Sequence, residues 1–163
     1  MEQLFNQLSE KLINSLHTDE QMKVSIDGEN SQFVRFSQSK VRQSGLVDDA
    51  SLNISLIKDG RTCNGSFTLT GNAESDEKKA IIELVRLRNE VVTLPKDPFV
   101  VLPEDTGSSR EDHSGSLLNQ ESTVAALSPS MQGVDLAGIW ASGRIFTGNA
   151  NSSGQKHWFA TDT

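Results

Sequence analysis

Three histidines and a short acidic run are the groups in this 163-residue sequence that could hold a metal ion. His17, His113 and His157 stand far apart, and none begins the His-Glu-x-x-His spacing that presents two zinc ligands on one helix face. The run Glu111-Asp112-His113 combines two ligand types, but it lies in the most polar stretch of the chain, which is typical of a solvated loop. Asp48-Asp49 offers too few carboxylates for a dedicated cation site, so a charge at a turn or sheet edge explains it better. We therefore expect no metal-binding residue in this chain.

The single cysteine and the glycine-spaced segments do not indicate a nucleophile or a phosphate-binding site. Cys63 would need a neighbouring histidine to act as a nucleophile, and its place on an expected strand favours a small apolar strand residue. The glycine-spaced segments 143–148 and 148–154 lack a P-loop lysine in register and do not open a helix, so hairpin turns explain them better than a phosphate cradle. We expect no catalytic and no cofactor-binding residue.

Basic and aromatic side chains that could suggest an RNA-binding sheet are Arg35, Lys40, Arg42 and Arg61 with Phe33 and Phe36. Phe33 and Phe36 have opposite strand parity, so at least one of them must face the core. A solvated outer face of a sheet is therefore favoured over an RNA platform. Trp140 and Trp158 are expected to pair across strands and not to form a ligand box.

The composition limits the partners further. A formal net charge of −7 and a sequence pI of about 4.9 disfavour binding to nucleic acid, because few phosphates would be neutralised. The single cysteine allows no intrachain disulfide, and the amino terminus has no signal-peptide pattern. No apolar run approaches the roughly 18 residues of a membrane span. We expect a soluble, cytoplasmic protein without nucleic-acid or membrane partners.

The elements that must position these groups follow from hydrophobic periodicity. Residues 2–17 form an amphipathic helix, and a second helix spans 74–93, capped by Asn72 or Ser75 and stopped by Pro95. Between them the pattern alternates with period two and predicts strands at 22–26, 32–36, 40–46, 52–56 and 62–69, with turns at 27–30, 37–39 and 58–61 and a break at Asp48-Asp49. This predicts an α+β fold, an antiparallel β meander covered on one face by two amphipathic helices.

The rest of the chain divides into two further parts. We expect a first domain at 1–94, a loop-rich linker at 95–132, and a β-hairpin at 133–163 that begins a truncated region. Within the linker, 99–102 could be a short strand and 117–127 a short helix. The hairpin would turn at 148–154.

Three segments, taken in order, resemble the amino-terminal region of the TldD/PmbA family, the so-called modulators of DNA gyrase. The first is Val34-Arg-Phe-Ser-Gln-Ser-Lys-Val-Arg-Gln43, which is similar to a strand-pair pattern of the family. The others are the Asp59-Gly-Arg61 turn before a helix, and the Asn151-Ser-Ser-Gly154 turn. Residues 95–132 depart from the family, which usually has a longer helical passage there.

The resemblance implies a two-domain protein that acts as a homodimer or heterodimer and processes peptides or unfolded protein segments. Some members are zinc metallopeptidases, and others are partner subunits without the zinc motif. The zinc ligands would lie after this chain, so no catalytic residue is carried over and no cofactor is expected in the fragment itself. The expected role is a scaffold that shapes the substrate cleft. The alternatives are a non-enzymatic protein-interaction module and, disfavoured by charge, an RNA-binding sheet.

Overall fold

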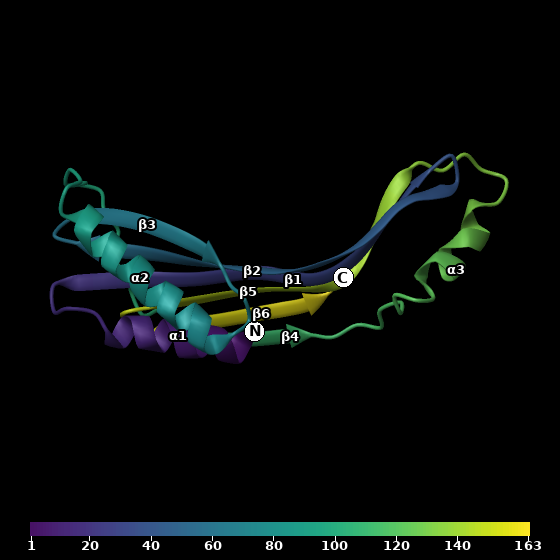
Figure 1. Ribbon diagram of the computed structural model, residues 1–163. Coiled ribbons are helices and arrows are strands. Elements are labelled where there is room, and N and C mark those ends of the chain that lie inside the picture. The colour runs from purple at the N-terminus through teal and green to yellow at the C-terminus, as the bar shows by residue number, and fades with distance from the viewer. The chain divides into compact units, whose positions relative to one another are not determined.

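The computed structural model describes residues 1–163 and has an α+β fold with a six-stranded, mostly antiparallel sheet (Figure 1). The elements in chain order are α1 (Glu2–Asn14), β1 (Glu20–Ser37), β2 (Lys40–Lys58), β3 (Arg61–Thr68), α2 (Ala73–Val91), β4 (Ser109–His113), α3 (Thr123–Leu127), the 3-10 turn η1 (Ser128–Met131), β5 (Gly138–Asn151) and β6 (Lys156–Asp162). The strand order is β3-β2-β1-β5-β6-β4. None of the helices combines the length and apolarity needed to cross a membrane.

The chain divides into two compact units, and long strands contribute residues to both. Unit 1 comprises Met1–Asp27, Ala50–Glu111 and Thr147–Phe159. Unit 2 comprises Gly28–Asp49, Asp112–Phe146 and Ala160–Thr163. The division expected at residues 94 and 132 stays a prediction.

The core of unit 1 lies between the sheet and its two long helices, α1 and α2, which lie on the same face (Figure 1). Because apolar residues recur every three or four positions, α1 presents one stripe to the sheet, and its Phe5 ring lies 6.2 Å from the ring of Trp158. The largest buried side chains come from α1, β1, β2 and α2, namely Phe5, Leu8, Leu12, Met22, Val24, Ile26, Leu52, Ile54, Leu56, Leu84, Leu87 and Val91. The two predicted helices and their cover of the sheet are confirmed here.

The start of α2 is fixed by two acceptors. The Asn72 side chain accepts a hydrogen bond from the backbone N–H of Ser75, as an N-cap residue does, and confirms one of the two predicted caps. Asp76 is fully buried and accepts hydrogen bonds from the backbone N–H groups of Thr70 and Gly71. The preceding turn is therefore tied to the first turn of the helix.

Unit 2 holds a smaller apolar cluster. Val34 and Phe36 of β1 are buried with Met131, and Leu127 and Trp140 pack against them. The β1–β2 hairpin closes through Gln38 and Ser39, which both have positive φ, 50° and 55°. Two such residues between paired strands make a type I′ turn.

The sequence pattern was wrong about the number of strands before α2. β1 and β2 are each continuous, without the turn predicted at 27–30 or the break predicted at Asp48-Asp49. Gly28 lacks the positive φ that a tight turn would need, and a Cβ at this position would meet the Phe146 ring at 2.5 Å. Gly28 therefore allows close packing against Phe146 and does not form a turn.

The linker region also differs from expectation. Residues 99–102 form no strand, the polar stretch contributes β4, and the predicted 117–127 helix is reduced to α3 followed by η1. The predicted carboxyl-terminal hairpin is present as β5 and β6. It belongs to the same sheet as the earlier strands, because β5 lies next to β1.

Candidate functional site: a polar groove on the sheet of unit 1

The sheet of unit 1 has a polar face opposite its core. Val24 and Ile54 are buried, and the residues beside them on β1 and β2 point the other way because strand side chains alternate. Those alternate residues are Lys23, Ser25, Asn53 and Ser55. The β2–β3 register pairs Asn53 with Ser66 and Ser55 with Asn64, so β3 adds two polar side chains to this face. Asn149 of β5 completes the row.

These residues line an open groove of about 840 Å³. A second hollow of about 460 Å³ shares Lys23 and Asn149 with the first. Its wall is formed by Val101, Leu102 and other residues of the segment that follows α2. We call the two hollows together the polar groove.

The polar side chains of the groove are free to bind a ligand. Lys23, Ser25, Asn53, Ser55, Ser66 and Asn149 make no hydrogen bond or ion pair with another side chain or with the backbone through their side chains. An amide or hydroxyl group offers both a donor and an acceptor. The groove therefore presents a row of solvent-accessible hydrogen-bonding groups, without partners in the chain, across β3, β2, β1 and β5.

The end of the groove at β3 is closed by an ion pair of α2. Arg86 donates hydrogen bonds to the Glu83 carboxylate, the shortest at 2.7 Å, and these bonds raise the pKa of its guanidinium. Arg86 also donates to the backbone carbonyl of Asn64 at 3.3 Å, which covers part of this sheet edge. A Cβ at Gly65 would lie 1.9 Å from Glu83 Oε1, so a larger residue there would force this carboxylate to move.

The segment after α2 is anchored at both of its ends. At one end Arg61 donates from Nε to the carbonyl of Leu94 at 2.7 Å, and the N–H of Asp97 donates to the carbonyl of Gly60 at 2.7 Å. At the other end Asn151 donates to the carbonyl of Glu104 at 2.9 Å. Between the anchors Phe99 and Val101 are 85% and 72% exposed, so apolar side chains face solvent beside a polar groove.

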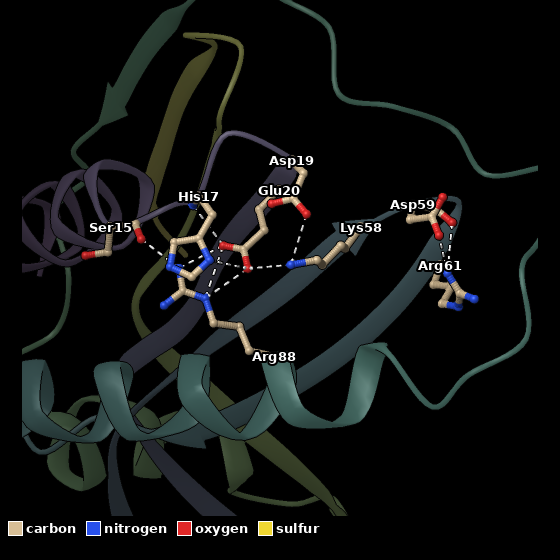
Figure 2. A network of polar contacts seen from close by, with 8 residues as sticks. All are labelled: Ser15, His17, Asp19, Glu20, Lys58, Asp59, Arg61 and Arg88. Atoms are coloured by element: carbon tan, nitrogen blue, oxygen red, sulfur yellow. Dashed lines mark hydrogen bonds and ion pairs between the residues drawn. The ribbon is translucent and has the colours of Figure 1, made fainter.

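A second cluster, around Glu20, brings together a possible metal-ligand set that the sequence reasoning missed. His17, Asp19 and Glu20 place ligand atoms within 4.8 Å of one another, and the signal in the sequence was the close spacing of His17-Thr-Asp-Glu20. Figure 2 shows the Glu20 carboxylate between Arg88 of α2, Lys58 of β2 and His17. The Glu20 side chain is fully buried, whereas those of His17 and Asp19 are 62% exposed.

Both oxygens of this carboxylate already have donors. Arg88 donates to Oε1 from Nε at 3.0 Å and to Oε2 from its terminal nitrogen at 2.7 Å, and the N–H of His17 donates to Oε2 at 3.0 Å. Lys58 lies 3.7 Å from Oε1. Burial is the largest single influence and raises the pKa of Glu20, but the hydrogen bonds from Arg88 and the His17 N–H, together with the charges of Arg88 and His17, outweigh it and leave the pKa below its usual range. A metal ion would have to displace a bidentate guanidinium next to a second cation, so the residues do not fit a metal site.

The Glu20 cluster instead joins four elements. Arg88 also donates to the carbonyl of Ser15 at 2.6 Å, just after α1 ends. Glu20 opens β1 and Lys58 closes β2, so one buried carboxylate fixes the ends of two helices and two strands. We call this cluster of Glu20 with Arg88, Lys58 and His17 the Glu20 clamp.

Of the residues weighed as metal ligands in the sequence, His17 belongs to this cluster and the others do not. His113 and Asp112 belong to β4, and Asp112 pairs with Arg144. The stretch is an exposed strand and not the loop that was predicted. His157 lies within 2.8 Å of the Ser109 hydroxyl through Nδ1. Asp48-Asp49 lies on β2 before its pairing with β3 begins at Ser51, which confirms a charge at the sheet edge.

The remaining sequence predictions have mixed outcomes. Cys63 is a buried strand residue as predicted, and burial raises the pKa of its thiol. Phe36 is buried and confirms that one of the two phenylalanines faces a core. The expected pairing of the two tryptophans is wrong, because Trp140 packs in the unit 2 cluster and Trp158 packs against Phe5.

The basic residues considered for an RNA-binding sheet are divided between the two units. Arg35, Lys40 and Arg42 are exposed in unit 2. Arg61 belongs to unit 1, where it binds the Leu94 carbonyl and the Asp59 carboxylate. Arg61 therefore has a structural role in anchoring the segment after α2.

Comparison with known proteins gives matches of structure only. No protein-family model and no curated protein matches the sequence. A candidate modulator of a DNA gyrase from Thermotoga maritima matches 97% of this chain with a TM-score of 0.69 and 14% identity. TldE from Thermococcus kodakarensis matches 99% with a TM-score of 0.66 and 13% identity. A candidate modulator of DNA gyrase from Bacteroides thetaiotaomicron matches 98% with a TM-score of 0.58 and 16% identity.

The match covers nearly all of this chain but only 37–38% of each of those structures. At 13–16% identity, these structural matches establish the fold alone. The resemblance to the TldD/PmbA family is therefore confirmed for the fold. The chain therefore has a TldD/TldE/PmbA-type fold and spans somewhat more than a third of the length of the proteins that share it.

Proposed function

We propose that this chain is a scaffold domain of a TldD/PmbA-like peptide-processing protein, and that its polar groove holds an extended polypeptide segment. The observation that carries the proposal is the row of free amide, hydroxyl and ammonium groups across four strands. Catalysis belongs to another part of the protein or to a partner chain. Zinc, a homodimeric or heterodimeric assembly and a cytoplasmic location are proposed for the whole protein on the strength of the fold match.

The dimensions of the groove suit a short extended segment. Neighbouring strands lie about 4.8 Å apart, so the four strands from β3 to β5 span roughly 14 Å. An extended peptide advances about 3.3 Å per residue, so about four residues would cross the groove. Their backbone N–H and C=O groups could each meet an amide or hydroxyl, which favours binding that depends little on side chains.

The Glu20 clamp supports a non-catalytic role for this domain. It is the one cluster in the chain that brings three possible metal ligands together, and its buried carboxylate is held by Arg88 and Lys58. A hydrolytic zinc site needs ligands that are free of such cations and a position left open for water.

The alternative is a protein-interaction module that handles no peptide substrate. The exposed Phe99 and Val101 favour it, because apolar side chains on an anchored segment are typical of a contact with another protein. In that case extended peptides would not bind in the polar groove.

The test is titration of the 163-residue chain with a neutral, unstructured ten-residue peptide, followed by amide NMR shifts. We expect shifts at residues 23–25, 53–55, 64–66 and 149, with α1 unaffected. A double variant, Asn53→Ala with Asn149→Ala, removes two amides and should weaken binding about tenfold. Asn89→Ala on the exposed side of α2 is the matched control and should bind normally.

Metal content separates a scaffold from an enzyme. The purified chain should contain far less than one zinc per molecule by mass spectrometry and should not hydrolyse peptides. Stoichiometric zinc that is lost in His17→Ala would contradict the scaffold role and would make the Glu20 clamp a metal site.

A further inference from the structure

Resting on the proposed function, we infer that the polar groove selects segments with an acidic residue next to an apolar one, and that Lys23 determines this selection. The acidic side chain would bind at Lys23, and the apolar side chain would lie against Val101 and Leu102. Both contacts lie in unit 1, where Lys23 belongs to both hollows of the groove.

Lys23 is the free cation of the groove. It is exposed on β1 and forms no ion pair, unlike Lys58 and Arg86, whose charges are taken by neighbouring carboxylates. An unpaired ammonium has three donors and no acceptor, so it favours a carboxylate over a neutral or cationic group.

None of the carboxylates near the groove forms an ion pair with Lys23. Glu83 is held by Arg86. Asp27 is on the same face of β1, but it accepts a hydrogen bond from Thr147 at 2.9 Å and does not line the groove. Glu104 lines the second hollow and forms no ion pair with Lys23. The ammonium group of Lys23 therefore forms no ion pair within the chain.

The apolar half of the site adjoins Lys23. Val101 is 72% and Leu102 49% exposed, and both line the second hollow together with Lys23. Burying them under a ligand side chain would remove apolar surface from water, which stabilises the complex. An acidic residue flanked by a large apolar residue matches both features.

The experiment measures fluorescence anisotropy of three labelled ten-residue peptides that differ only in one central residue, Glu, Gln or Lys, beside a leucine. The wild-type chain should bind the Glu peptide about fivefold more tightly than the Gln peptide, and the Lys peptide most weakly. Raising the salt concentration from 0.05 to about 0.5 M should reduce the Glu preference, because screening weakens an exposed ion pair.

Variants assign the preference to Lys23. Lys23→Gln should remove the difference between the Glu and Gln peptides, and Lys23→Arg should retain it. Lys79→Gln changes an exposed lysine of α2 without an ion pair and is the matched control for net charge. Val101→Ser should weaken binding of the Glu peptide about threefold. A fourth peptide, in which serine replaces the leucine, should bind Val101→Ser and wild type equally.

The outcomes separate this inference from the proposed function. Equal affinity of the wild-type chain for the Glu and Gln peptides would overturn the inference and leave a neutral peptide groove. A Glu preference that survives in Lys23→Gln would also overturn it. If none of the peptides bound, the proposed function would fail together with the inference.

Discussion

At the scale of single residues, Glu20 is the buried charge that connects α2 with the ends of β1 and β2. Its carboxylate is fully buried and is held by Arg88, the His17 backbone and Lys58 (Figure 2). Breaking a buried ion pair by removing one partner is costly, because the other charge is left without compensation. Glu20 is therefore a stability residue, although its neighbours include possible metal ligands.

Glu20→Gln should lower the free energy of unfolding by about 3 kcal/mol, because Arg88 would lose its charged partner in a buried site. Urea denaturation followed by circular dichroism measures this. Glu10→Gln, on the exposed side of α1, is the control and should change the stability by less than about 0.5 kcal/mol. A loss no larger for Glu20→Gln than for Glu10→Gln would show that the clamp contributes little.

The pH dependence of stability gives an independent check on the same residue. Folding lowers the pKa of Glu20 from its ordinary value of 4.5. The ionised carboxylate therefore contributes its full share to the folding stability above that value, and this share is lost as the pH falls through the folded pKa. The melting temperature of wild type should fall below about pH 4.5, more steeply than that of Glu20→Gln. Parallel curves for the two proteins would contradict this assignment.

At the scale of elements, two hairpins use the same turn type with different residues. The β2–β3 turn has Asp59 and Gly60 at positive φ, 49° and 70°, which are residue types suited to a type I′ turn. The β1–β2 turn uses Gln38 and Ser39. Ser39 also donates from its hydroxyl to the carbonyl of Val134 at 2.5 Å. The β1–β2 turn therefore accepts less suitable residues and gains a contact to the chain before β5.

Gln38→Asn should stabilise the chain by about 0.5–1 kcal/mol, because asparagine adopts positive φ at lower cost than glutamine. Gln38→Val should destabilise it by more than about 1 kcal/mol, since a β-branched residue is disfavoured there. Urea midpoints of the two variants measure both effects. Gln43→Asn, on the exposed part of β2, is the control and should be neutral or slightly destabilising. If Gln38→Asn and Gln43→Asn shift the midpoint in the same direction, turn geometry is not the cause.

At the scale of the whole molecule, the two units have cores of different size. Unit 1 buries large side chains from two helices and several strands. Unit 2 buries Val34, Phe36 and Met131, with two partly buried neighbours. Regions with few buried apolar contacts open locally at a lower free energy. The strand β1 runs through both units, so it reports on both cores.

Amide hydrogen exchange along β1 should therefore differ between its two halves. Residues 30–37 should exchange at least about tenfold faster than residues 20–27, although both halves belong to one strand between β2 and β5. Mass spectrometry of peptic fragments resolves the two segments. Equal protection along β1 would mean that the two units open together.

Local sequence preferences account for several parts of the fold. The periodicity of α1 and α2, the Asp59-Gly60 turn and the Asn72 cap each follow from interactions within a few residues. The α+β class follows from the order of these elements. The length of β1 did not, because Gly28 resembles a turn residue until Phe146, far along the chain, is placed against it.

The candidate sites, in contrast, depend on contacts between distant segments. Alternation shows that Lys23 and Asn53 face away from a core, but it does not show that Ser66 and Asn149 join them in one groove. The Glu20 clamp likewise needs Arg88, 68 positions away, which no local pattern connects to Glu20. Sites of this kind depend on which strands become neighbours, and that is set by packing between distant segments and not by the preferences of any one segment.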